Sequence, residues 1–171
     1  MSCHSNSKAC VKDVVRAIID AQDEVADRDC CSTGCDQSIA ELLSPSGTNG
    51  NNATTIPFLL YCDCKPFIGT GLVRDNGTYD CIETPVFKAC KFVEGSDTCV
   101  QLELLQPVYD ASVSQNCVRK DGLCSLLEGV TDFYSTRVCI TVDLNCFCAI
   151  SCLDPIRPLS NLPVTRCSSM D

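Results

Sequence analysis

The sequence lacks tryptophan altogether, and only 6% of its 171 residues are aromatic. The hydrophobic fraction of 45% counts the cysteines, so the ordinary apolar core is modest and covalent bonds are expected to supplement it. Basic residues are also scarce: 13 Lys and Arg stand against 22 Asp and Glu, for a formal net charge of -9. This balance argues against a nucleic-acid partner, because a polyanion is held by Lys and Arg. No apolar run approaches 18 residues, so no membrane span is predicted.

Residues that would carry catalysis or bind a metal are few as well. His4 is the only histidine, and no Cys-x2-Cys spacing of the zinc-site or thioredoxin kind occurs. There is no Gly-rich phosphate loop and no Ser/His/Asp set. The sequence therefore predicts no enzyme, no catalytic residue, no cofactor and no bound metal. A thiol-rich metal-binding or redox-buffering module is the alternative interpretation.

The start of the chain has no apolar segment of the kind found in secretory signal peptides, yet 17 of the 171 residues, about 10%, are cysteine, as in disulfide scaffolds. A cysteine-rich chain without an export signal is unexpected, because the reducing cytosol normally prevents disulfides from forming. Three explanations are open: metal binding, redox chemistry, or oxidation that follows assembly as the producing cell lyses.

The pattern divides the chain into four parts. Residues 1–9 are expected to be a flexible arm, residues 10–35 an amphipathic helix with a Cys-rich turn, residues 54–153 a β domain, and residues 154–171 a Pro-containing tail. The helix from Cys10 to Asp29 carries an apolar stripe that consists of Val11, Val14, Val15, Ile18 and Val25. This stripe packs either on the chain's own sheet or on the same helix of a neighbouring subunit.

The β domain is predicted from turns and alternation. Asp75-Asn76-Gly77 and Gly95-Ser96-Asp97 mark two hairpins. Pro57 limits the strand over residues 54–62 to an edge or to a strand start. Alternation over Arg137–Cys148 places Val138, Ile140, Val142, Leu144, Cys146 and Cys148 on one strand face. The fold class is therefore mainly β with one N-terminal helix, in an antiparallel sandwich or barrel-like domain.

An odd number of cysteines leaves at least one thiol without a partner in its own chain. Cys3, Cys10 and Cys167 lie near the chain ends and are the candidates for inter-subunit disulfides. The cysteines expected to be structural are Cys31, Cys35, Cys62, Cys64, Cys90, Cys99, Cys139, Cys146, Cys148 and Cys152.

The stretch from Cys139 to Leu153, CITVDLNCFCAISCL, resembles the C-terminal signature of the Bacillus spore coat and exosporium family that includes CotY, CotZ and ExsY. Other segments agree in order: Cys10-Val11-x-Asp13-Val14-Val15, Cys31-Ser32-Thr33-Gly34-Cys35, Ile56-Pro57-Phe58 and Pro85-Val86-Phe87. The resemblance covers most of residues 10–153. The chain departs from the family at Ser32, in the loop over residues 44–53, over residues 107–122, and in the tail from residue 154.

The resemblance implies a structural role. Proteins of this family are made in the mother-cell cytoplasm without a signal peptide and build the coat crust or the exosporium basal layer of the spore. They form cyclic homo-oligomers, hexamers in this group, which join laterally into a two-dimensional hexagonal lattice and become cross-linked by disulfides. The expected partners are further copies of the chain and other spore coat or exosporium proteins.

Overall fold

The computed structural model describes residues 11–24, 31–44, 52–75, 77–109 and 122–160. The chain divides into two compact units, residues 1–32 and residues 33–171. In the first unit the described residues form helix α1 (Val11–Asp23). The predicted apolar stripe is exposed, from 45% at Val14 to 77% at Val11. Val25, the last predicted member of the stripe, lies outside the described residues.

The described residues of the second unit form three short helices and eight strands. The helices are α2 (Cys35–Leu43), α3 (Leu123–Leu127) and the 3-10 helix η1 (Leu144–Cys146). The strands are β1 (Phe58–Cys62), β2 (Lys65–Pro66), β3 (Gly69–Asp75), β4 (Thr78–Thr84), β5 (Phe87–Phe92), β6 (Cys99–Tyr109), β7 (Val130–Asp143) and β8 (Ala149–Cys152).

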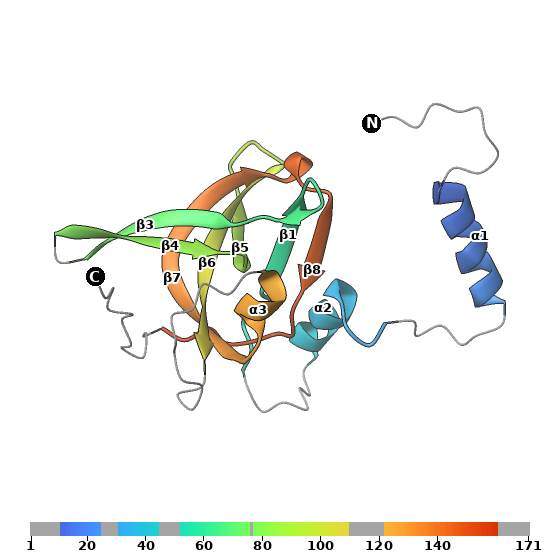
Figure 1. Cartoon of the computed structure of the whole chain (residues 1–171), viewed down its shortest axis with the longest axis horizontal. Helices are drawn as coiled ribbons and strands as arrows, with labels where there is room; N and C mark the ends of the chain where they lie inside the picture. Colours follow the sequence, from blue (N-terminus) through green and yellow to red (C-terminus); the bar gives the residue numbers. More distant parts are fainter. Residues whose placement is uncertain (1–10, 25–30, 45–51, 76, 110–121, 161–171) are drawn as a thin grey trace. The chain divides into compact units, whose positions relative to one another are not determined.

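Antiparallel pairing runs in the order β2-β1-β5-β6-β7, and β8 pairs with β1 outside this path. The sheet curls into a half-barrel, and the separate β3–β4 hairpin extends beyond it (Figure 1). The prediction of a mainly β, antiparallel, barrel-like domain with an N-terminal helix is confirmed. Helices α2 and α3 were not predicted, because 9 and 5 residues are too short for a clear helical period.

One face of the sheet is covered by the β3–β4 hairpin. Phe87, Leu102 and Leu104 are almost fully buried there. The hairpin approaches closely because it presents glycine: a Cβ at Gly69 would lie 2.5 Å from Phe87 Cε1, and one at Gly71 would lie 2.5 Å from Val138 Cγ1. A larger residue at either position would require the hairpin or the core side chains that it contacts to shift.

The other face has its own core, formed by Leu59, Val86, Leu105 and Phe133. Leucine side chains of α3 pack against this cluster, and the Tyr109 hydroxyl donates a hydrogen bond to the Leu126 carbonyl. The two faces together explain why the central strands are apolar on both sides.

The predicted strand over Arg137–Cys148 is corrected by the structure. Strand β7 begins seven residues earlier, at Val130, and ends at Asp143. The Asp143 side chain accepts a hydrogen bond from the Asn145 N–H at 3.0 Å and so starts η1. Leu144, Cys146 and Cys148 therefore do not continue the buried face, and all three are exposed.

Candidate functional site: the exposed thiols

A disulfide between Cys35 and Cys152 joins the start of α2 to the end of β8. The Cα atoms are 4.8 Å apart, and the bond spans a sequence separation of 117 residues. Next to it the buried Ser38 hydroxyl lies 2.9 Å from the carbonyl oxygens of both Gly34 and Leu153. The disulfide and the hydrogen bond from Ser38 to the Leu153 carbonyl hold α2 against the β domain.

Ten further cysteines of the described residues are free, and eight of them are exposed. The exposed ones are Cys31, Cys64, Cys81, Cys90, Cys124, Cys139, Cys146 and Cys148, while Cys62 and Cys99 are half-buried. Free cysteine usually packs as a small buried hydrophobe. At these eight positions the thiol faces solvent and is available for chemistry with another molecule.

Three of the ten free thiols gather where β1 ends and β8 begins. The ladder between the two strands closes with Tyr61 opposite Ala149. Cys148 then donates its backbone N–H to the Tyr61 carbonyl at 2.9 Å, and its Sγ lies 3.3 Å from the same oxygen. The pKa of the Cys62 thiol is raised by burial, by the Asp63 carboxylate, and by the Cys146 and Cys148 thiols. We call Cys62, Cys146 and Cys148 the three-thiol cluster.

Phe147 explains why Cys146 and Cys148 remain at the surface. Its ring packs edge-on against Phe67 with centroids 5.2 Å apart, and it belongs to the partly buried shell of the core. The residues on either side of this inward-facing anchor are both exposed. Cys64 follows Cys62 by two residues and lies in the turn between β1 and β2, with a left-handed φ of 60°.

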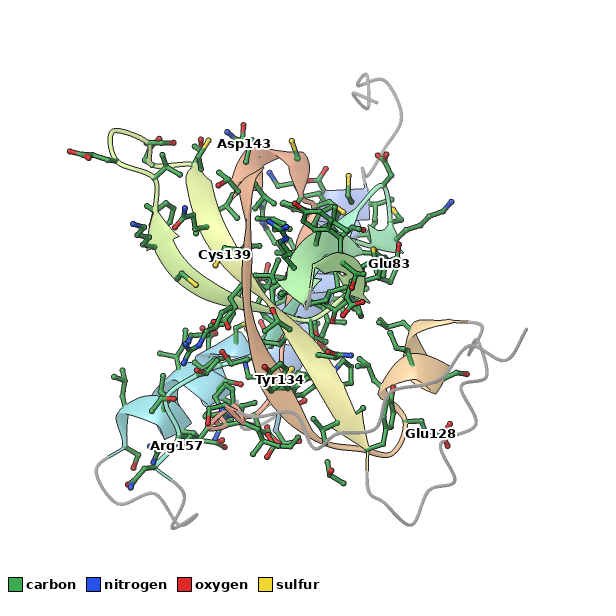
Figure 2. All side chains as sticks on the ribbon, turned by 90° about the vertical axis from the view of Figure 1, so that its left-hand side faces the viewer. Glu83, Glu128, Tyr134, Cys139, Asp143 and Arg157 are labelled. Carbon is green, nitrogen blue, oxygen red and sulfur yellow. A yellow bond between two sulfur atoms is a disulfide. The ribbon has the colours of Figure 1, made fainter. Side chains whose placement is uncertain are left out.

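Apart from the three-thiol cluster, two further thiols lie close together, Cys90 on β5 and Cys139 on β7. The Cys90 and Cys139 side chains interact directly, and Figure 2 shows Cys139 on β7, the strand that ends at Asp143. Burial raises the pKa of the Cys139 thiol; Cys90 and Glu103 add to this rise and Lys88 opposes it. At neutral pH the Cys139 thiol is therefore less reactive than its exposure alone suggests.

Beneath that pair lies the buried carboxylate of Glu103, which is 6% exposed. It accepts hydrogen bonds from the Ser135 hydroxyl and from the Arg137 N–H at 2.9 Å, and it lies 3.5 Å from Lys88 Nζ. Desolvation raises the pKa of the Glu103 carboxyl, but the hydrogen bonds and the charge of Lys88 outweigh it, so the net pKa is lowered. The carboxylate holds β5, β6 and β7 together beside a bulge in β7, where Arg137 has a φ of 59°.

The β3–β4 hairpin carries another exposed thiol, Cys81, directly opposite Leu72. Leu72 is 63% exposed and Tyr79, two residues before Cys81, is 67% exposed. Sequence reasoning did not single out Cys81 or Cys124 of α3. The Asp75-Asn76-Gly77 sequence predicts a hairpin turn, and the register that follows from such a turn could have indicated that Cys81 faces outward.

The predicted inter-subunit cysteines Cys3, Cys10 and Cys167 lie outside the described residues, so their assignment stays a prediction. Within the part of the chain that the structure describes, no group of three or more His, Cys, Asp or Glu side chains is placed to hold a metal ion. None of the helices in the described ranges is long and apolar enough to cross a membrane.

These features define a thiol-rich β protein with an internal disulfide and many outward-facing cysteines. The chain belongs to the Spore coat protein Z family, whose model matches residues 1–155. It is 33% identical to Spore coat protein Z of Bacillus subtilis (strain 168) over 150 residues, which are 87% of this chain and 91% of that protein. No solved structure matches the chain significantly. Family membership supports a structural role in the spore coat and favours a non-enzymatic protein.

Proposed function

We propose that the chain assembles with itself into a two-dimensional hexagonal lattice in the outer layers of the spore, and that disulfides cross-link this lattice. The observation that carries the proposal is the set of eight exposed free thiols in a member of a spore coat family. The layer is the exosporium basal layer or the coat crust.

Non-covalent contacts arrange the subunits first. The apolar stripe of α1 is suited to this step, because Val14, Val15 and Ile18 are each between 45% and 49% exposed. A stripe of this kind gains free energy when it packs on the same stripe of a neighbour. A cyclic hexamer uses one repeated contact, and further contacts extend it laterally to other rings and to other coat proteins.

Oxidation makes the lattice permanent. Two thiols of neighbouring subunits and one low-molecular-weight disulfide give one inter-subunit disulfide and two low-molecular-weight thiols, so two electrons pass from protein to oxidant. The chain is made in the reducing mother-cell cytoplasm, where thiols stay reduced. Cross-linking then follows as the mother cell lyses and the layer matures.

A non-reducing gel of assembled, oxidised protein tests the covalent step. We expect a ladder of multimers that collapses to the monomer on reduction. Replacing Cys3, Cys10 and Cys167 together by Ser is expected to shorten the ladder, whereas Cys99→Ser, which changes a half-buried thiol, should leave it unchanged. A ladder that the triple replacement leaves unchanged would contradict the assignment of the tail cysteines, and the absence of any ladder would contradict cross-linking itself.

A further inference from the structure

The three-thiol cluster contains an odd number of sulfurs, and this has a chemical consequence. One disulfide can form among Cys62, Cys146 and Cys148, and it leaves one thiol over. Which two combine depends on geometry, because a disulfide needs Cβ atoms about 3.5–4.5 Å apart. The contacts where β1 ends and β8 begins distinguish the three thiols.

The Cys146 and Cys148 thiols both act on Cys62, but Cys148 is the one whose own backbone is hydrogen-bonded to the strand that carries Cys62. The N–H and the Sγ of Cys148 both contact the Tyr61 carbonyl oxygen, at 2.9 and 3.3 Å, and this carbonyl belongs to the peptide that links Tyr61 to Cys62. These two contacts hold the Cys148 backbone against the Tyr61–Cys62 peptide, so a disulfide between Cys62 and Cys148 joins chain segments that are already hydrogen-bonded to each other. Cys146 lies beyond Phe147, in η1, outside this ladder.

We propose that Cys62 and Cys148 close an internal disulfide, and that Cys146 is left as the thiol that bonds a second copy of the chain. The intermolecular half of this inference rests on the proposed function, while the internal bond does not. Cys146 is exposed and is carried by a short helix that the Asp143 carboxylate holds in place. A fixed, outward thiol reaches a neighbour at a defined point of the surface.

The chemistry balances with a low-molecular-weight disulfide as oxidant. The exposed Cys148 sulfur attacks it first, because the Cys62 thiol is half-buried and less accessible to the oxidant. A mixed disulfide forms and one small thiol leaves. Cys62 then attacks the Cys148 sulfur, the Cys62–Cys148 bond forms, and the second small thiol leaves. Two Cys146 thiols, or Cys146 and another exposed thiol of the second copy, consume a further oxidant molecule in the same way.

Disulfide mapping of the full chain by mass spectrometry tests this. In dilute protein treated with glutathione disulfide, we expect the Cys62–Cys148 peptide at a yield independent of protein concentration, with Cys146 open to alkylation. In concentrated protein, Cys146 should move into intermolecular peptides. The Cys35–Cys152 peptide serves in every sample as the marker of a folded chain.

Two variants sharpen the test. Cys62→Ser removes the internal partner of Cys148, so Cys148 should appear in intermolecular peptides and covalent multimers should increase. A variant that only damaged the fold would lose the Cys35–Cys152 peptide instead. Cys81→Ser, which changes an exposed thiol on the β3–β4 hairpin, is the matched control and should alter neither bond of the cluster.

Internal bonding of Cys146 in the dilute chain would overturn the inference. So would concentrated protein whose links avoid Cys146, although the proposed lattice would then stand on other cysteines. A chain that forms the Cys62–Cys148 bond but never any intermolecular peptide would overturn cross-linking, and the role of Cys146 with it, while the internal bond would remain.

Discussion

At the scale of single residues, Glu103 is an unusual choice for an almost fully buried position. Its carboxylate is retained because three groups on β5 and β7 bind it: the Ser135 hydroxyl, the Arg137 N–H and the Lys88 ammonium. The charge is thus compensated by hydrogen bonds as well as by one cation, which is what a buried carboxylate requires.

Glu103→Gln keeps the shape but removes the charge, and we expect it to lower the free energy of unfolding at neutral pH by about 1–3 kcal/mol. The lowered pKa of Glu103 means that its stabilisation is complete above the ordinary glutamate pKa of about 4.3 and is lost as the pH falls through the lower folded value. Urea unfolding from neutral to acid pH should therefore show the two proteins converging in acid.

Glu83→Gln is the control for this experiment, because Glu83 is exposed on β4. It should change the free energy of unfolding little at any of these pH values. Equal stability of wild type and Glu103→Gln at neutral pH would contradict the role given to the buried carboxylate.

The Cys35–Cys152 bond closes a long segment of chain. Because it spans 117 residues, Cys152→Ser is expected to cost about 4–5 kcal/mol of stability by restoring freedom to the unfolded chain. The difference should be seen in oxidised protein and should vanish when both proteins are unfolded in the presence of a reductant. Equal stability in the oxidised state would show that this bond does not restrain the fold.

At the scale of elements, the hairpins could be predicted and the strand ends could not. Turn residues act locally, so Gly77 and Gly95 mark the β3–β4 and β5–β6 hairpins with φ values of 89° and 77°. The end of β7 depends instead on one side-chain bond from Asp143, which overrides an alternating pattern that continues beyond it. The three-thiol cluster was missed because it needs the non-local register of β1 with β8.

Helix α1 gives a prediction of its own. Replacing Val14 and Ile18 together by Ser removes apolar surface from the exposed stripe. If the stripe packs on a neighbouring subunit, the double variant should associate at least tenfold more weakly in sedimentation, a loss of about 1.4 kcal/mol or more, with the unfolding of the β domain unchanged. Asp20→Ser, on the polar side of α1, is the control.

The opposite outcome separates the two interpretations of the stripe. Loss of stability in the β domain, with association unchanged, would show that α1 packs on its own sheet. The proposed helix contact between subunits would then be wrong, while disulfide cross-linking through the exposed thiols would be unaffected.

At the scale of the whole molecule, charge and sulfur act in opposite directions. A formal net charge of -9 makes copies repel one another, and salt or divalent cations should weaken this repulsion and promote assembly. Once subunits are in contact, the exposed thiols can fix them. Composition already indicated this combination, whereas the positions of the thiols on the surface required the fold.

The most direct test is electron microscopy of the purified chain at high concentration, first with reductant and then after oxidation. The account predicts ordered two-dimensional sheets that, after oxidation, survive detergent until a reductant is added. Isolated particles under oxidising conditions, with every thiol either free or bonded within its own chain, would contradict it.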